Sequence, residues 1–173
     1  MESFGINLPQ SDGYQRVINY YNSLMNNGNT IFYGIFKRNY LTKISIKTIL
    51  GMDWIIVASM AFYGKVKSLD STYINISIEG ASKNKESLVE FSGLPNYYKK
   101  VFWYSVALNI LKDILFSQIY KEIHFFNRFT LSIKCFFIIY RNFILKTNFL
   151  YIFLKKLLNY LFKFHNKIFN KSI

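Results

Sequence analysis

Asp53 is the residue of this 173-residue chain whose type and position could do chemistry. It stands directly before residues 54–63, a run without a charged residue that is followed by Gly64. An ionised carboxylate can take a proton from a hydroxyl group, which is the task of a general base. Aspartate is also favoured at the N-cap of a helix, where it only stabilises the first turn. The spacing alone leaves both interpretations open.

Few other side chains could form a reactive centre. His124 and His165 have no carboxylate or second histidine at helical spacing, which argues against metal binding or acid–base catalysis by either. Cys135 is the one cysteine, so no intrachain disulfide can form, and a reducing, cytoplasmic compartment is expected. The sequence also lacks a phosphate-binding glycine loop and a Ser/His/Asp grouping. These observations argue against hydrolases, kinases and zinc proteins.

The elements that must position Asp53 are helices and short strands. Residues 11–29 predict a helix, because Asp12 and Gln15 have capping-box spacing and apolar residues recur on one face. Residues 30–36, TIFYGIF, are β-branched and aromatic and predict a strand with a central glycine. Residues 54–63 predict a helix that is buried on several sides because it is apolar almost all round.

Residue types at both ends of this helix predict where it begins and where it stops. Asp53 is predicted as its N-cap, and Gly64 is predicted to follow its last turn in the left-handed conformation. Residues 72–79 alternate isoleucine with polar residues and predict a second strand with one buried face. The charged segment 83–91 predicts a helix that ends at Gly93.

The composition of the chain changes after Pro95, beyond which it contains neither glycine nor proline. Residues 99–173 carry 13 basic and 2 acidic side chains, whereas residues 1–98 carry 9 basic and 7 acidic side chains. We therefore expect two parts, residues 1–95 and a basic, aromatic helical tail of residues 96–173. The predicted fold class is α+β and mostly helical.

The segment NTIFYGIFKRNYL, followed by GMDWIIVASMAFYGKVKSLDSTYINISIEGAS, resembles the second half of family 2 glycosyltransferases, which have a GT-A fold. The resemblance covers roughly residues 28–95. It rests on a Tyr-Gly-hydrophobic strand, an Asp-Trp motif, a buried helix ending in Gly-Lys, and a Gly-Ala-Ser turn, in that order. It implies that residues 1–95 are the acceptor-side portion of such a domain.

The resemblance also implies an activity and the residues that perform it. A sugar would be transferred from a nucleotide-sugar donor to a glycan or lipid-linked acceptor, with Asp53 as the general base. Tyr33, Gly34 and Trp54 would contact the acceptor, although a glycine within a strand also marks an ordinary bulge. Lys37 and Arg38 could contact a phosphate group, but exposed basic pairs are usually only solvated.

Two parts of the family pattern have no counterpart in this sequence: the nucleotide-binding first half and its Asp-x-Asp metal motif. Family members usually use a divalent metal, Mg²⁺ or Mn²⁺, with the nucleotide sugar. No residue here is expected to hold that metal or the donor, so the chain is expected to be inactive alone. Nucleotide sugar and glycan acceptor become partners once a donor-binding half is supplied.

The tail predicts membrane contact. Lys134, Arg141, Asn148 and Lys155 recur every seven residues and form one stripe of a helix with a wide apolar face opposite. This pattern is typical of a helix in a membrane interface, where basic side chains reach anionic headgroups. The residues expected to contact the membrane are Lys134, Arg141, Lys155, Lys156 and Lys163.

Three interpretations of the tail remain open. Its apolar face could instead pack on the chain's own core, and basic residues among aromatic ones also suit nucleic acid, although no nucleic-acid-binding signature is present. With membrane contact, the expected location is peripheral on the cytoplasmic face of the cell membrane. The alternative to an enzyme is a non-catalytic protein that binds a membrane surface and retains a GT-A remnant.

Overall fold

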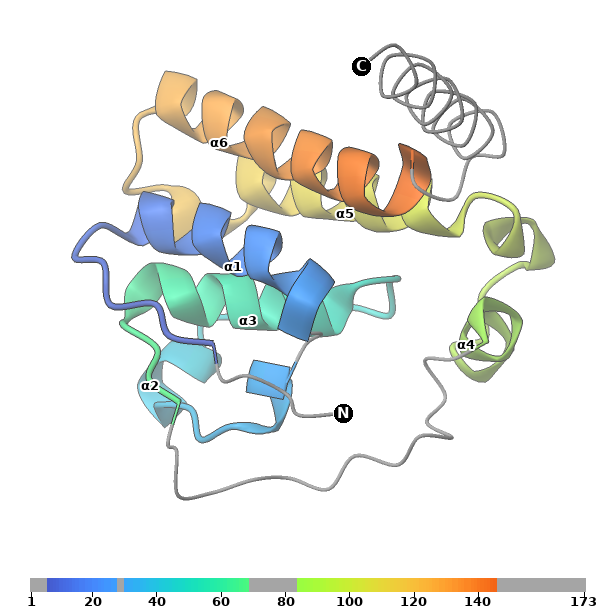
Figure 1. Cartoon of the computed structure of the whole chain (residues 1–173), viewed down its shortest axis with the longest axis horizontal. Helices are drawn as coiled ribbons and strands as arrows, with labels where there is room; N and C mark the ends of the chain where they lie inside the picture. The colour runs from blue at the N-terminus through green and yellow to red at the C-terminus, as the bar shows by residue number, and fades with distance from the viewer. Residues whose placement is uncertain (1–5, 28–29, 69–83, 146–173) are drawn as a thin grey trace, which may run out of the picture.

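The structure, a computed structural model, describes residues 6–27, 30–68 and 84–145 (Figure 1). These residues are mostly helical, as predicted, and contain no strand. Leu8 and Val66 form an isolated antiparallel bridge. The α-helices are α1 (Gly13–Asn27), α2 (Arg38–Leu41), α3 (Met52–Tyr63), α4 (Lys85–Phe91), α5 (Phe102–Phe116) and α6 (Phe125–Ile139). Three short 3-10 helices, η1 (Thr30–Tyr33), η3 (Asn96–Lys99) and η4 (Gln118–Tyr120), and a π-helical turn, η5 (Tyr140–Leu145), complete the described elements.

The four longest helices form the core. In Figure 1, α1 lies between α3 and α6, and α5 runs beside α6. All four contribute fully buried apolar side chains, among them Val17, Val57, Ile110 and Leu131. The core is therefore shared by residues on both sides of the boundary predicted after residue 95.

Helix α1 begins where the sequence predicts. The Asp12 carboxylate accepts a hydrogen bond from the Tyr14 backbone N–H at 3.0 Å, so Asp12 satisfies one of the free donors of the first turn. The Gln15 side chain does not complete a capping box, because it donates to the Asn19 amide oxygen at 2.9 Å. The buried face of α1 includes Tyr20 in addition to the apolar residues that periodicity predicts.

Helix α3 is buried on every side, as its composition predicts: all seven residues from Ile55 to Ala61 are buried. Its predicted N-cap is wrong. The N-cap is Gly51, with φ +78°, and its carbonyl accepts the first helical hydrogen bond, from Ile55 N–H at 3.0 Å. A side chain here would collide with Val106, since an ideal Cβ would lie 2.9 Å from its Cγ1. Asp53 is instead the second residue of the helix.

The other end of α3 also differs from the prediction. Gly64 is extended, with φ −151° and ψ 162°, and is not left-handed. The physical reason is Arg16 of α1, whose guanidinium donates to the Ala61 carbonyl at 2.6 Å and the Phe62 carbonyl at 2.8 Å. Because these carbonyls already have a donor, the chain needs no left-handed turn to satisfy them.

The strand predicted at residues 30–36 is also wrong, because residues 30–33 form the 3-10 helix η1. A strand needs a neighbour to satisfy its backbone groups, and the described residues contain no other strand. The segment bonds locally instead, with Gly34 N–H donating to the Ile31 carbonyl at 2.9 Å. The second predicted strand, residues 72–79, lies outside the described residues.

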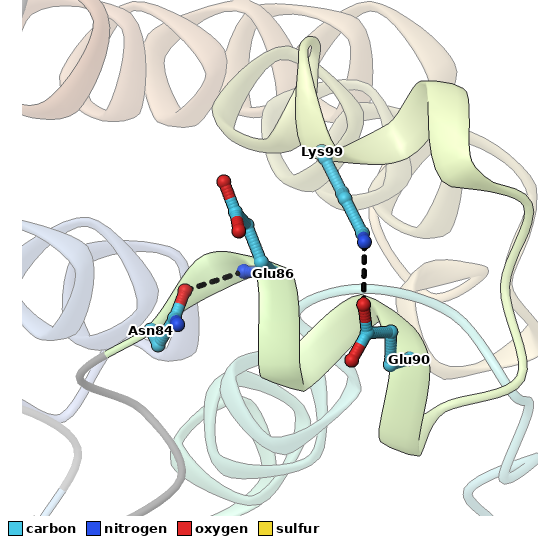
Figure 2. Close-up of polar contacts among 4 residues, drawn as sticks. All are labelled: Asn84, Glu86, Glu90 and Lys99. Carbon is cyan, nitrogen blue, oxygen red and sulfur yellow. Dashed lines mark hydrogen bonds and ion pairs between the residues drawn. The ribbon is translucent and has the colours of Figure 1, made fainter.

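Helix α4 confirms the helix predicted before Gly93 (Figure 2). The Asn84 side chain accepts from Glu86 N–H at 2.9 Å and caps its start. At its end Gly93, with φ +64°, and Leu94 donate to the Glu90 and Val89 carbonyls, which is a Schellman motif. Lys99 Nζ then pairs with the Glu90 carboxylate at 2.6 Å and joins η3 to α4.

Candidate functional site

Asp53 lies on the first turn of a rigid helix. Its carboxylate is half-buried, and the residues that follow it are held in the core on all sides. The positive end of the helix dipole favours a negative charge at this position. Asp53 also lies close enough to Tyr20 to affect it: burial raises the pKa of the Tyr20 phenol first, and the Asp53 charge raises it further. This arrangement can hold a carboxylate in a fixed direction beside the buried Tyr20 phenol.

Trp54 belongs to an aromatic cluster at the same end of α3. Its ring stacks on Trp103 of α5, with centroids 5.8 Å apart, and meets Phe143 of η5 at 5.2 Å. Trp103 and Phe143 are themselves 4.5 Å apart, and Lys85 Nζ lies 5.3 Å from the Trp103 ring. The cluster therefore joins α3, α5 and η5 beside Asp53.

Tyr33 and Gly34 lie at the end of η1, which packs against α3. The four residues predicted to serve the base and the acceptor thus come from two elements in contact. The Tyr33 ring is 60% exposed, and the neighbouring Ile35 is fully exposed. Lys37 and Arg38 are exposed at the start of α2.

Among the described residues, no group of three or more histidine, cysteine or acidic side chains could hold a metal ion. His124 caps α6, because its Nδ1 accepts from the Phe126 backbone N–H at 3.4 Å. Cys135 is fully buried, and burial raises the pKa of its thiol. Both residues therefore have structural roles.

Helix α6 has two apolar faces. Leu131, Cys135 and Ile139 are fully buried on one of them. The other face is exposed and carries phenylalanine side chains that are 45–68% accessible, within a sector of about 120° at roughly 100° per residue. These side chains, hereafter the phenylalanine face, are Phe125, Phe126, Phe129 and Phe137.

Two of the basic residues predicted to contact a membrane belong to this region. Lys134 is exposed on α6, with Nζ 5.4 Å from the Tyr14 ring centroid, and Arg141 is exposed in η5. The predicted contacts Lys155, Lys156 and Lys163 lie outside the described residues. Of the helices in the described ranges, none is long and apolar enough to cross a bilayer.

Sequence reasoning missed the partners that position Asp53 and Trp54. Gly51 was recognisable, because glycine two residues before an acidic first-turn residue is itself an acceptable helix start. Trp103 and Phe143 had no such signal, since aromatic contacts between distant segments depend on tertiary packing. The role of Arg16 at the other end of α3 had only a weak signal in the sequence, namely a basic residue within an otherwise apolar helix face.

The comparisons with known proteins give no relative for this chain. No protein-family model matches the sequence, and neither a curated protein nor a solved structure matches it.

Proposed function

We propose that the chain is the acceptor-side part of a family 2 glycosyltransferase with a GT-A fold. Its task would be transfer of a sugar from a nucleotide-sugar donor to a glycan or lipid-linked acceptor. The observation that carries the proposal is Asp53, a half-buried carboxylate on the first turn of a helix buried on all sides. This position corresponds to the base in the motif that the sequence resembles.

In the proposed reaction, the Asp53 carboxylate accepts the proton of the acceptor hydroxyl as that oxygen attacks the anomeric carbon of the donor sugar. The bond from this carbon to the nucleotide phosphate breaks, and the nucleotide leaves with the electron pair. Trp54, held by Trp103 and Phe143, and the exposed Tyr33 would orient the acceptor. The donor and any Mg²⁺ or Mn²⁺ would be bound by a separate, nucleotide-binding half.

The test compares the purified chain with the product of the longest in-frame reading frame that contains it. Each is incubated with a panel of nucleotide sugars and Mg²⁺ or Mn²⁺, and donor hydrolysis and sugar transfer are measured. Asp53→Asn should lower transfer by at least about 100-fold, since a general base typically contributes that much. Glu86→Gln is the matched control, because Glu86 is a first-turn carboxylate of another helix.

Two results would reject the enzyme proposal. One is transfer by Asp53→Asn at the rate of the Glu86→Gln control. The other is the absence of donor turnover from both proteins with every nucleotide sugar of the panel.

A second candidate function, binding to an anionic membrane surface, is favoured by the phenylalanine face. Exposed aromatic side chains beside Lys134 and Arg141 suit the interface, where rings enter the acyl boundary and cations meet headgroups. Each basic side chain near such a surface contributes about 1 kcal/mol. With or without catalysis, such binding would place the protein peripherally on the cytoplasmic face of the cell membrane.

Liposome flotation tests this candidate. The chain should float with vesicles that contain phosphatidylserine and float less with phosphatidylcholine alone. The double variant Phe125→Ser/Phe126→Ser should reduce flotation, whereas Phe91→Ser, which removes a 90% exposed phenylalanine from α4, should not. Equal flotation of both variants, or no flotation of the unmodified chain, would reject the candidate.

A further inference from the structure

An open cavity of about 600 Å³ lies at the end of α3 that is remote from Asp53. Four parts of the chain form it: the start of α1, the end of α3, the segment that connects η4 to α6, and the first turn of α6. Phe62 follows Asp53 by nine positions in the helix, a distance of roughly 13 Å along the axis. The side chains that matter for the argument are Asp12, Tyr14, Phe62, Tyr63, Glu122 and Asn127.

The floor of the cavity is rigid because the two helix ends meet closely. An ideal Cβ on Gly13 would lie 2.5 Å from the Phe62 carbonyl oxygen, so only glycine permits this approach. Beneath it the buried Arg16 guanidinium donates to four backbone carbonyls, at 2.5–2.8 Å, which fixes the end of α3 against the start of α1. A ligand would therefore meet a preformed surface, as most small-molecule sites offer.

The walls combine aromatic rings with hydrogen-bonding groups of both kinds. Asp12 and Glu122 are exposed carboxylates that accept hydrogen bonds, and the Asn127 amide both donates and accepts. Burial, and then the Glu122 charge, raise the pKa of the Tyr63 phenol, so it stays protonated and able to donate. The volume lies within the range of small-molecule sites.

Charges of both signs surround the cavity, so neither a cationic nor an anionic ligand is attracted by all of them. Lys134 Nζ lies 5.4 Å from the centroid of the Tyr14 ring, and Lys43 Nζ lies 5.1 Å from that of Tyr63. These cations already use the negative faces of the rings and would repel a cationic ligand. An anion would be repelled by Asp12 and Glu122. A neutral ligand with several hydroxyl groups and an apolar face meets neither repulsion.

We propose that this cavity binds one neutral sugar residue of a glycan. The apolar C–H face of the sugar ring packs on the Phe62 side chain and on those parts of the Tyr14 and Tyr63 rings that line the cavity and that Lys134, Lys43 and Tyr40 leave uncovered. Its hydroxyl groups donate to Asp12 and Glu122. Hydrogen bonds to carboxylates are the stronger ones because they are charge-assisted. The site does not depend on the chemistry proposed for Asp53, and it would serve equally in a protein that only binds glycans.

Saturation-transfer difference NMR on the full chain tests the proposal. The probes are methyl glycosides of neutral hexoses and N-acetylhexosamines, with choline as the cationic probe and inorganic phosphate as the anionic probe. We expect saturation transfer to ring protons of at least one glycoside, whereas choline should show none. Phosphate binding is followed by ³¹P line broadening and should also be absent.

Variants locate the binding. Glu122→Gln should weaken the glycoside roughly fivefold by removing a charge-assisted acceptor from an exposed position where folding does not depend on it. Tyr14→Ala should weaken it further by removing a stacking surface, with circular dichroism to show that the variant is folded. Glu86→Gln, which changes an exposed carboxylate of α4 that does not line the cavity, should leave binding unchanged. Loss of binding on Glu122→Gln and Tyr14→Ala separates this proposal from the enzymatic one, because both residues lie at the other end of α3 from Asp53.

Three outcomes would overturn the proposal: no saturation transfer from any glycoside, preferential binding of choline or phosphate, or glycoside binding that Glu122→Gln and Tyr14→Ala both leave intact.

Discussion

Asp113 of α5 makes the stability of this protein depend on pH. Burial raises the pKa of its carboxyl group to about 6, against the opposing effect of the Lys47 charge. The group lies near the buried phenols of Tyr21 and Tyr120, whose pKa values its charge helps to raise. The folded protein therefore prefers the neutral acid, whereas the unfolded chain ionises near pH 3.8.

The magnitude follows from this difference. A carboxyl group with a raised pKa in the folded state contributes most at low pH, and the contribution is lost as the pH rises through 6. At about 1.4 kcal/mol per pKa unit, the cost of ionising Asp113 in place amounts to roughly 2 to 3 kcal/mol between pH 4 and pH 8. Such a change is a large fraction of the stability of a typical domain.

Asp113→Asn removes the titrating group and keeps its shape. Relative to the unmodified chain, the free energy of unfolding of the variant should rise by about 2 to 3 kcal/mol between pH 4 and pH 8. Urea unfolding, followed by tryptophan fluorescence at several pH values, measures this difference. Glu86→Gln is the control, since Glu86 is an exposed carboxylate, and its difference from the unmodified chain should change little with pH.

A difference in the free energy of unfolding between Asp113→Asn and the unmodified chain that stays constant with pH would refute the reasoning. It would mean that Asp113 ionises in the folded protein as readily as in water. Lys47→Met provides a second check. Removing the cation that favours the ionised form should make the loss of stability above pH 6 steeper.

Three further predictions concern particular contacts. Arg16→Met should lower the free energy of unfolding by about 3 kcal/mol, measured in urea, because it leaves buried carbonyls without a donor; Arg16→Lys should recover little, since an ammonium cannot reproduce the guanidinium fork. Gly51→Ala should lower the free energy of unfolding, measured in urea, by more than Gly93→Ala does. Both glycines have positive φ, but a Cβ collides with a neighbour only at Gly51, whereas Gly93 has open space around it. Cys135 should resist Ellman's reagent at pH 8 in the folded protein and react fully in urea; labelling of the folded protein would contradict its burial.

The sequence predicts elements whose signals are local. The period of apolar residues in α1, the uniform apolarity of α3, and Gly93 after α4 each correspond to an observed helix or helix end. These signals act within a few residues, where backbone geometry and side-chain burial dominate.

Features that depend on distant residues could not be predicted in this way. TIFYGIF has the composition of a strand, yet strand formation requires a neighbour, and η1 forms where the described residues provide none. Gly64 has the residue type of a left-handed cap, yet Arg16, far away in sequence, satisfies the carbonyls that such a cap would serve. Of the candidate site, sequence identifies Asp53 and Trp54, but not the aromatic partners that fix Trp54.

The burial of residues Ile55 to Ala61 of α3 has a consequence for how the chain matures. A helix that is apolar on all sides has no water-compatible face, so it is stable only when its neighbours are present. Some of these neighbours, Val106 against Gly51 and Tyr120 against Phe62, come from residues synthesised more than fifty positions later. During translation, α3 therefore leaves the ribosome as an exposed hydrophobic segment and must be shielded until η4 follows. A nascent chain stalled near residue 95 should be a chaperone substrate, whereas the chain that has left the ribosome should not be.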